Sequence, residues 1–123
     1  MNTGNNNEQI EKNDDWKRDG YTLRVRGGDG NLGKKSTDPI GLSRSILHVL
    51  KNNEDGYVKL LSVGPTALNI AMKAFRMASD EIEKKTDGAV LVMRQSEYVA
   101  EINGKNTKGV CTRVFAIPIK YAI

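Results

Sequence analysis

The segment GDGNLGKKS, from Gly28 to Ser36, carries two incomplete nucleotide-binding patterns. Its glycines Gly28, Gly30 and Gly33 form the G-x-G-x-x-G pattern of dinucleotide-binding folds. The same segment misses the phosphate-binding pattern G-x-x-x-x-G-K-[S/T] by one position, because Lys35 stands where a metal-binding hydroxyl is needed. Both patterns hold phosphate groups at the N-terminus of a helix that starts within the motif. Whether this segment binds a nucleotide therefore depends on where the next helix begins.

The helix after this segment is predicted to begin beyond the motif. Asp38 is a favourable N-cap residue and Pro39 suits the first helical turn, so the sequence predicts a helix from about Pro39 to Lys51. A helix that began at Gly33 would carry Pro39 in its second turn, where proline lacks a donor and clashes with the preceding turn. The acid that contacts a ribose at the end of the second strand is also missing, since Glu54 precedes that strand. The sequence thus disfavours a nucleotide cofactor.

Catalytic and metal-binding groups are scarce in the chain. His48 is the only histidine and Cys111 the only cysteine, so a disulfide framework is excluded and a structural zinc site is not expected. No second histidine can activate Cys111, and no paired carboxylates are placed by pattern in a cleft. We expect His48 to lie on the surface and Cys111 to be a small core residue of a strand. A non-enzymatic protein without cofactor or metal is therefore expected.

Charge divides the chain into two parts. Residues 1–19 hold five acids and three bases, a net charge of −2, and few large apolar groups apart from Trp16. Because such a segment cannot bury enough surface to offset the entropy of ordering, we expect 1–19 to be a flexible polar tail and 20–123 to be the folded domain. The whole-chain net charge of +4 leaves +6 for that domain, which favours a polyanionic partner such as nucleic acid.

Hydropathy and cysteine content indicate the compartment. No apolar run reaches the roughly 20 residues of a membrane span, and the polar N-terminus lacks the apolar centre of a signal peptide. We therefore expect an intracellular protein, cytoplasmic or nuclear, with no membrane partner.

The elements expected along the chain alternate and then end in a hairpin. YTLRVR is a half-buried strand, and YVKLLSV is apolar on both faces, as in a central strand covered on two sides. Asn103-Gly104 marks a reverse turn within the connection NGKNTK. The expected elements are a strand at 21–26, a helix at 39–51, a strand at 57–63, a helix at 65–85 and hairpin strands at 88–102 and 108–122. This order predicts one α+β two-layer sandwich, with two helices against a small mixed sheet.

The second helix carries the most distinctive motif. The apolar positions that recur at helical spacing, and that we expect in the core, are Leu68, Ala71, Met72, Phe75, Ala78 and Ile82. The segment LLSVGPTALNIAMKAFRMA resembles the stage V sporulation protein S family, which carries a helix of the A-L-N-x-A-x-K-A type. The residues that match in place are Ala67, Leu68, Asn69, Ala71, Lys73 and Ala74. The likeness extends more thinly over residues 21–121, through the opening strand, the proline-started helix and the final hairpin.

That family looks like a branch of the Alba-like superfamily of small two-layer proteins, which commonly dimerise and bind DNA or RNA. The resemblance implies an Alba-like β-α-β-α-β-β fold and a homodimer. In Alba-like proteins, lysines in the loop before the first helix meet the nucleic-acid backbone, and the long hairpin reaches along a groove. By position, the loop lysines would be Lys34 and Lys35, and the hairpin bases Lys105, Lys108 and Arg113. The chain departs from the family in its N-terminal tail and in a longer, glycine-rich first loop.

The residues themselves point to the same partner without the family. The basic groups able to contact several phosphates are Lys34 and Lys35 on the loop, Lys105 and Lys108 beside the turn, and Lys73 with Arg76 on one helical face. For each residue alone, the alternative is a solvated side chain on an exposed surface. Tyr98 and Tyr121 are candidate stacking platforms, although aromatic side chains of strands usually pack.

Two classes of function follow. The first is a non-enzymatic protein that contacts the DNA or RNA backbone with low sequence specificity, as a homodimer formed through the second helix or a sheet edge. The alternative is a structural or regulatory module on the same scaffold, which binds a protein partner through the N-terminal tail with Trp16. Small-ligand binding at the glycine-rich loop is a third hypothesis. The sequence does not distinguish DNA from RNA.

Overall fold

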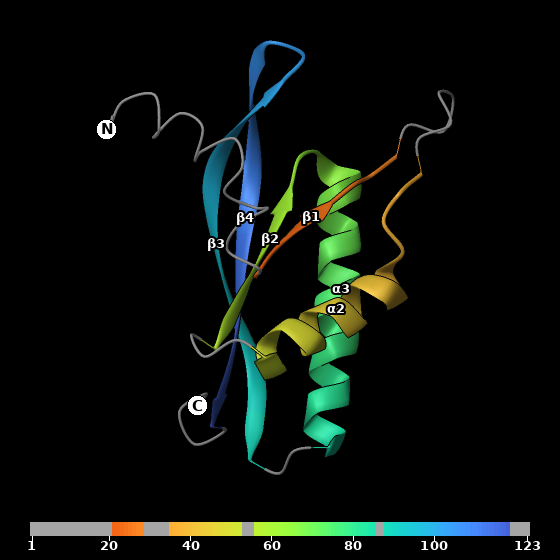
Figure 1. The fold of residues 1–123 in the computed structure, drawn as a ribbon, viewed down its shortest axis with the longest axis vertical. Coiled ribbons are helices and arrows are strands. Elements are labelled where there is room, and N and C mark those ends of the chain that lie inside the picture. The colour runs from red at the N-terminus through yellow and green to blue at the C-terminus, as the bar shows by residue number, and fades with distance from the viewer. Residues whose placement is uncertain (1–20, 29–34, 53–55, 86–87, 119–123) are drawn as a thin grey trace.

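The computed structural model describes residues 21–28, 35–52, 56–85 and 88–118. Its elements are β1 (Thr22–Val25), α2 (Pro39–Asn52), β2 (Tyr57–Ser62), α3 (Pro65–Lys85), β3 (Ala89–Ile102) and β4 (Lys105–Pro118). This β-α-β-α-β-β order confirms the predicted α+β two-layer sandwich (Figure 1). The predicted tail at 1–19, which includes Trp16, lies outside the described residues, as do Lys34 and Tyr121. No helix within the described ranges is long and apolar enough to cross a membrane.

The four strands form one mixed sheet in the order β1-β2-β4-β3. β1 runs parallel to β2, whereas β4 is antiparallel to both of its neighbours. Both helices pack on the same face of this sheet, and α2 crosses α3 at a steep angle (Figure 1). The internal position of β2 confirms its predicted central place.

The prediction that β2 is covered on both faces is wrong for the described part of the chain, where the helices cover one face. Val58, Leu60 and Ser62 are buried beneath the helices. Tyr57 and Leu61 point to the other face and are only half-buried. The pattern misled because β2 also carries aromatic and apolar side chains on the side that neither α2 nor α3 covers.

The start of α2 is held by its predicted cap. The Asp38 carboxylate accepts hydrogen bonds from the amides of Ile40 at 3.3 Å and Gly41 at 3.2 Å. These bonds satisfy two of the amides that the start of a helix leaves without a partner in the helix. Pro39 is the first residue of α2, as predicted. The helix therefore begins after the glycine motif, and its first amides bind Asp38 where a nucleotide site would bind phosphate.

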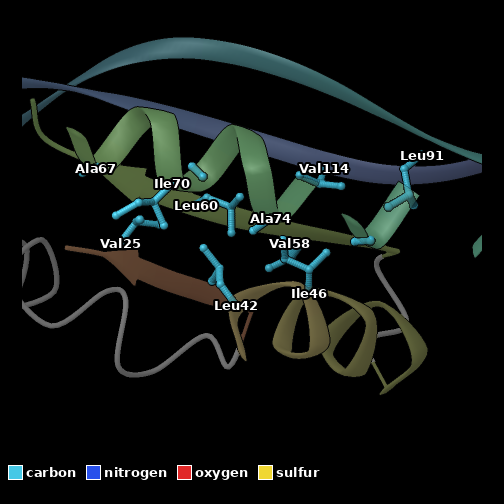
Figure 2. Close-up of a cluster of buried hydrophobic side chains, with 12 residues drawn as sticks. Val25, Leu42, Ile46, Val58, Leu60, Ala67, Ile70, Ala74, Leu91 and Val114 are labelled. Atoms are coloured by element: carbon cyan, nitrogen blue, oxygen red, sulfur yellow. The ribbon is translucent and has the colours of Figure 1, made fainter. Parts of the chain in front are cut away.

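The core is built on a stripe of alanines along α3. Ala67, Ala71, Ala74 and Ala78 are almost completely buried, and their short side chains let the helix lie close to the sheet. The larger core side chains, shown in Figure 2, are Val25, Leu42, Ile46, Val58, Leu60, Ile70, Leu91 and Val114. The predicted core positions that are only half-buried are Leu68, Met72, Phe75 and Ile82. Met72, Phe75 and Ile82 pack against the core from its margin, whereas Leu68 does not belong to it, because the buried stripe follows the alanines instead of the bulkiest side chains.

The hairpin turn is shorter than the sequence indicates. Ile102 pairs with Lys105, so the turn contains only Asn103 and Gly104, whose φ angles are 53° and 77°. Two successive positive φ angles are typical of the tight hairpin turn that Asn-Gly favours. The rest of NGKNTK already belongs to β4. This turn fixes the register of the whole β3–β4 hairpin, whose tip extends well beyond the first turn of α3 (Figure 1).

We expect Gly104→Ala to lower the free energy of unfolding by about 1 kcal/mol, because a residue with a Cβ atom is disfavoured at positive φ. The matched control is Gly41→Ala in the first turn of α2, where the added Cβ would meet Asp38 Oδ2 at an ordinary 3.5 Å. Alanine at that helical position is expected to raise stability by up to about 1 kcal/mol. Urea denaturation followed by circular dichroism measures both variants. Changes of equal sign and size would contradict the turn geometry.

Candidate nucleic-acid interface

The sheet face turned away from the two helices, which we call the open face, is basic. Side chains alternate between faces along a strand, so Val58 and Leu60 point to the helices and the residues between them point to the open face. The strand pairing extends this alternation and places five bases on the open face, namely Arg24, Lys59, Arg94, Lys105 and Arg113. The two carboxylates of the strands, Glu97 and Glu101, belong to the opposite face. Among the described strand residues, the open face thus carries bases and no acid.

A cleft of about 590 Å³, which we call the basic cleft, opens at the hairpin end of this face. Arg24 and Arg26 line it from the end of β1, and Lys35 lines it from the C-terminal end of the glycine-rich loop. The other described residues that line it are Val25, Gly27, Gly28, Leu61, Val63, Tyr98 and Ile102, and none of these is acidic. The basic cleft therefore joins the first strand, the glycine-rich loop and the hairpin.

Two contacts fix the ends of the glycine-rich loop beside the cleft. The amide of Arg26 donates to Thr37 Oγ1, and the amide of Thr37 donates to the Arg26 carbonyl, both at 2.8 Å. Gly27 lies against the first turn of α3, where an added Cβ would come within 3.1 Å of the Ala67 nitrogen. Because the bonds of Arg26 use its backbone atoms, its exposed guanidinium is available to a ligand.

Tyr98 forms the hairpin wall of the basic cleft. Its ring lies over Gly109 of the paired strand, where an added Cβ would be 2.8 Å from Tyr98 Cε1. Burial raises the pKa of the Tyr98 phenol above its ordinary value of 10.0, although the nearby charge of Arg24 acts in the opposite direction. The phenol is therefore neutral near neutral pH and can donate a hydrogen bond to a ligand.

Three of the predicted binding residues lie on or beside the open face. Lys35 lines the basic cleft. Lys105 is exposed next to the hairpin turn, and Arg113 is half-buried in the middle of β4, both on the open face. Lys34 lies outside the described residues.

The other predicted bases do not join this surface. Lys108 points to the helix side of the hairpin, where its ammonium is 3.8 Å from Glu97 Oε2 in an exposed ion pair. Lys73 and Arg76 are exposed on α3, in the helical layer on the far side of the sheet. The predicted bases of the described residues therefore fall into two groups on opposite sides of the sheet.

Four bases of the open face and cleft were not among the predicted binding residues, namely Arg24, Arg26, Lys59 and Arg94. A signal was present for the first two, because the alternation of YTLRVR already placed Arg24 and Arg26 together, away from the apolar side. Arg94 could be placed only from the hairpin register, which pairs it with Arg113.

The single histidine and the single cysteine lie apart from the basic cleft. His48 is exposed on α2, as predicted. Cys111 is buried as predicted, but it lies between Leu61 and Ser96 on the open face, outside the helix-side core. Within the ranges that the structure describes, no cluster of histidine, cysteine, aspartate and glutamate could hold a metal ion.

We expect Tyr98 to ionise later than an ordinary tyrosine in an ultraviolet pH titration, and this late step to be missing in Tyr98→Phe. Deprotonation of Tyr98 is harder in the folded state, so the free energy of unfolding is unaffected by this group below pH 10.0 and falls as the pH rises above it. The Tyr98→Phe variant should therefore lose less stability at alkaline pH than the natural protein. Titration curves that differ only in amplitude would contradict the burial of this phenol.

The comparisons with known proteins do not assign the chain to a family. It matches no protein-family model, and no curated protein matches it. The resemblance to the stage V sporulation protein S family stays a prediction from residues 60–78 and, more thinly, from residues 21–121. The function of the basic cleft has to be argued from its residues and geometry.

Proposed function

We propose that the protein is a non-enzymatic nucleic-acid-binding protein that holds the sugar-phosphate backbone of DNA or RNA in the basic cleft. The observation that carries this proposal is the convergence of Arg24, Arg26 and Lys35 in one cleft that no acidic side chain among the described residues lines. Backbone contacts carry no sequence information, so the binding is expected to have low sequence specificity.

Charge distribution favours a polymer over a single small anion. Arg24 belongs both to the cleft and to the open face, where Lys59 and Arg113 continue the basic surface along the sheet. Lys105 extends the same face to the hairpin turn. A single nucleotide would contact a few of these basic side chains, whereas a nucleic acid presents a phosphate at every nucleotide and can neutralise the basic side chains in succession.

The residues of the cleft suit phosphate recognition in detail. An arginine guanidinium offers planar paired donors that match phosphate oxygens, and a lysine ammonium offers a compact charge. Gly27 and Gly28 carry no side chain on the loop wall, so a phosphate can approach the backbone there. The neutral Tyr98 phenol adds a hydrogen-bond donor on the opposite wall.

A homodimer, which the family resemblance implies, is part of this proposal. The sheet order leaves β1 and β3 as edge strands among the described residues. Each therefore has one backbone edge that no described strand pairs with, and a second copy could pair there. Two copies would double the number of phosphate contacts and steepen the salt dependence of binding. Sedimentation of the protein with and without nucleic acid measures this state directly.

We expect the full chain to bind labelled duplex DNA, single-stranded DNA and structured RNA with an affinity that falls with salt. On duplex DNA, log affinity against log salt should have a slope of about −0.9 per phosphate contact. Replacing Arg26 and Lys35 together by glutamine should weaken binding and make the slope less negative by the amount expected for about 2 phosphate contacts. Fluorescence anisotropy across a salt series measures both quantities.

The matched control replaces Lys73 and Arg76 on α3 by glutamine, which removes the same charge from the helical layer. This control should bind like the natural protein. Binding to none of the three probes at low salt, or binding that ignores salt, would contradict the proposal. An equal loss in both double variants would show that net charge acts without the cleft.

A further inference from the structure

A row of bases crosses the middle of the open face. Lys59 on β2 pairs with Arg113 on β4, and Arg113 pairs in turn with Arg94 on β3. Like charges directly opposite one another on a sheet are destabilising. Within the described part of the chain, neither Arg94 nor Arg113 forms an ion pair with a carboxylate. The fold thus holds Arg94 and Arg113 opposite each other against their mutual repulsion, and a bound anion would relieve it.

An aromatic cluster lies next to the basic row on the same face. Tyr57 and Phe115 form the cross-strand pair that follows Lys59 and Arg113, and their ring centroids are 5.8 Å apart. Tyr21 packs on Tyr57 with a centroid distance of 4.8 Å. All three rings are only half-buried. Their exposed parts give the open face apolar surfaces beside its charges.

Charge and ring surface are also linked directly. The Lys59 ammonium lies 5.5 Å from the centroid of the Tyr21 ring. Along β2 and β4, the aromatic residue is two positions from the base, which is roughly 7 Å for an extended backbone. Cations and rings thus alternate over a short distance on one surface.

This alternation matches the chemistry of a single strand. Proteins bind single-stranded nucleic acids by combining cations along the backbone with aromatic rings on which bases stack. A four-stranded sheet that presents aromatic side chains on its open face is one known platform for such stacking. A duplex keeps the faces of its bases inside its own stack, so it can use the basic row but not the rings.

Resting on the proposed function, we propose that the open face binds single-stranded DNA or RNA. The bases stack on Tyr57 and Phe115, and the phosphates lie along Lys59, Arg113 and Arg94. The strand continues into the basic cleft, because the next pair on the open face is Arg24 with Leu61, and both of these residues line the cleft.

One rival occupant belongs to the chain itself. Residues 1–19 carry a net charge of −2 and join the described chain at the aromatic cluster, where Tyr21 begins it. Their acids could neutralise the same basic row. Nucleic acid is favoured because each of its nucleotides offers a base that can stack on the rings, whereas residues 1–19 offer one aromatic side chain, Trp16. The rivalry itself can be measured.

The test titrates the full chain with labelled oligothymidylate and with a duplex of equal length. Phe115→Leu keeps an apolar side chain and removes the stacking ring, so oligothymidylate should bind about tenfold more weakly while duplex affinity changes by less than about twofold. Arg113→Gln should flatten the salt slope on the single strand by about 0.7. The control pair Lys73→Gln and Arg76→Gln should leave both probes unaffected.

The outcomes separate this inference from the proposed function. No binding of the natural protein to any nucleic acid overturns both. The single-strand site alone is overturned if the double variant Arg26→Gln, Lys35→Gln loses binding while Phe115→Leu and Arg113→Gln bind oligothymidylate with unchanged affinity. Unaltered thermal unfolding and duplex affinity show that Phe115→Leu is folded.

Two further measurements keep the result decisive if Phe115→Leu does not fold. Photocrosslinking of an iodouracil oligonucleotide to the natural protein should label the peptides that contain Tyr57 or Phe115, and labels confined to α3 overturn the inference. Replacing Asp14, Asp15 and Asp19 together by asparagine tests the rival occupant. Tighter oligothymidylate binding in that variant shows competition for the open face and supports the site, whereas weaker binding places the strand elsewhere.

Discussion

Close packing of the α3 alanine stripe on one face of the sheet is the constraint on which the rest of the structure depends. Ala71, Ala74 and Ala78 are fully buried, so a larger side chain at any of them would overfill the space between helix and strands. α2 adds Ile46 to the same core. Because both helices use one face, the strands alone compose the other face within the described part of the chain, and its chemistry follows from their alternation.

The hairpin turn decides which charges that other face receives. A strand shifted by one residue would exchange its two sets of side chains between the faces. With the tight Asn103-Gly104 turn, Arg94 stands opposite Arg113 on the open face, and Glu97 points to the helix side with Lys108. The segregation of bases from acids is therefore a consequence of register, and the turn that sets the register also sets the charge of the surface.

Local signals in the sequence predicted the elements well and the site poorly. Asp38 and Pro39 located the start of α2, because capping and proline geometry act within a few residues. The basic cleft depends on the tertiary arrangement of the sheet, which no local pattern encodes, since its lining residues Arg24 and Tyr98 come from the two outer strands. The face on which Lys108 lies was not predictable for a related reason, because it depends on a turn of two residues instead of the longer connection that polar composition suggests.

The glycine-rich loop shows why the cleft suits a polymer better than a nucleotide. In a nucleotide site, helix amides surround one phosphate, yet here the first amides of α2 bind Asp38 and the first turn of α3 is covered by Gly27. Phosphate recognition is left to long side chains such as Arg26 and Lys35, which respond to charge and tolerate varied geometry. Such groups do not define a single ligand closely, but they fit a backbone that offers the same anion at every step.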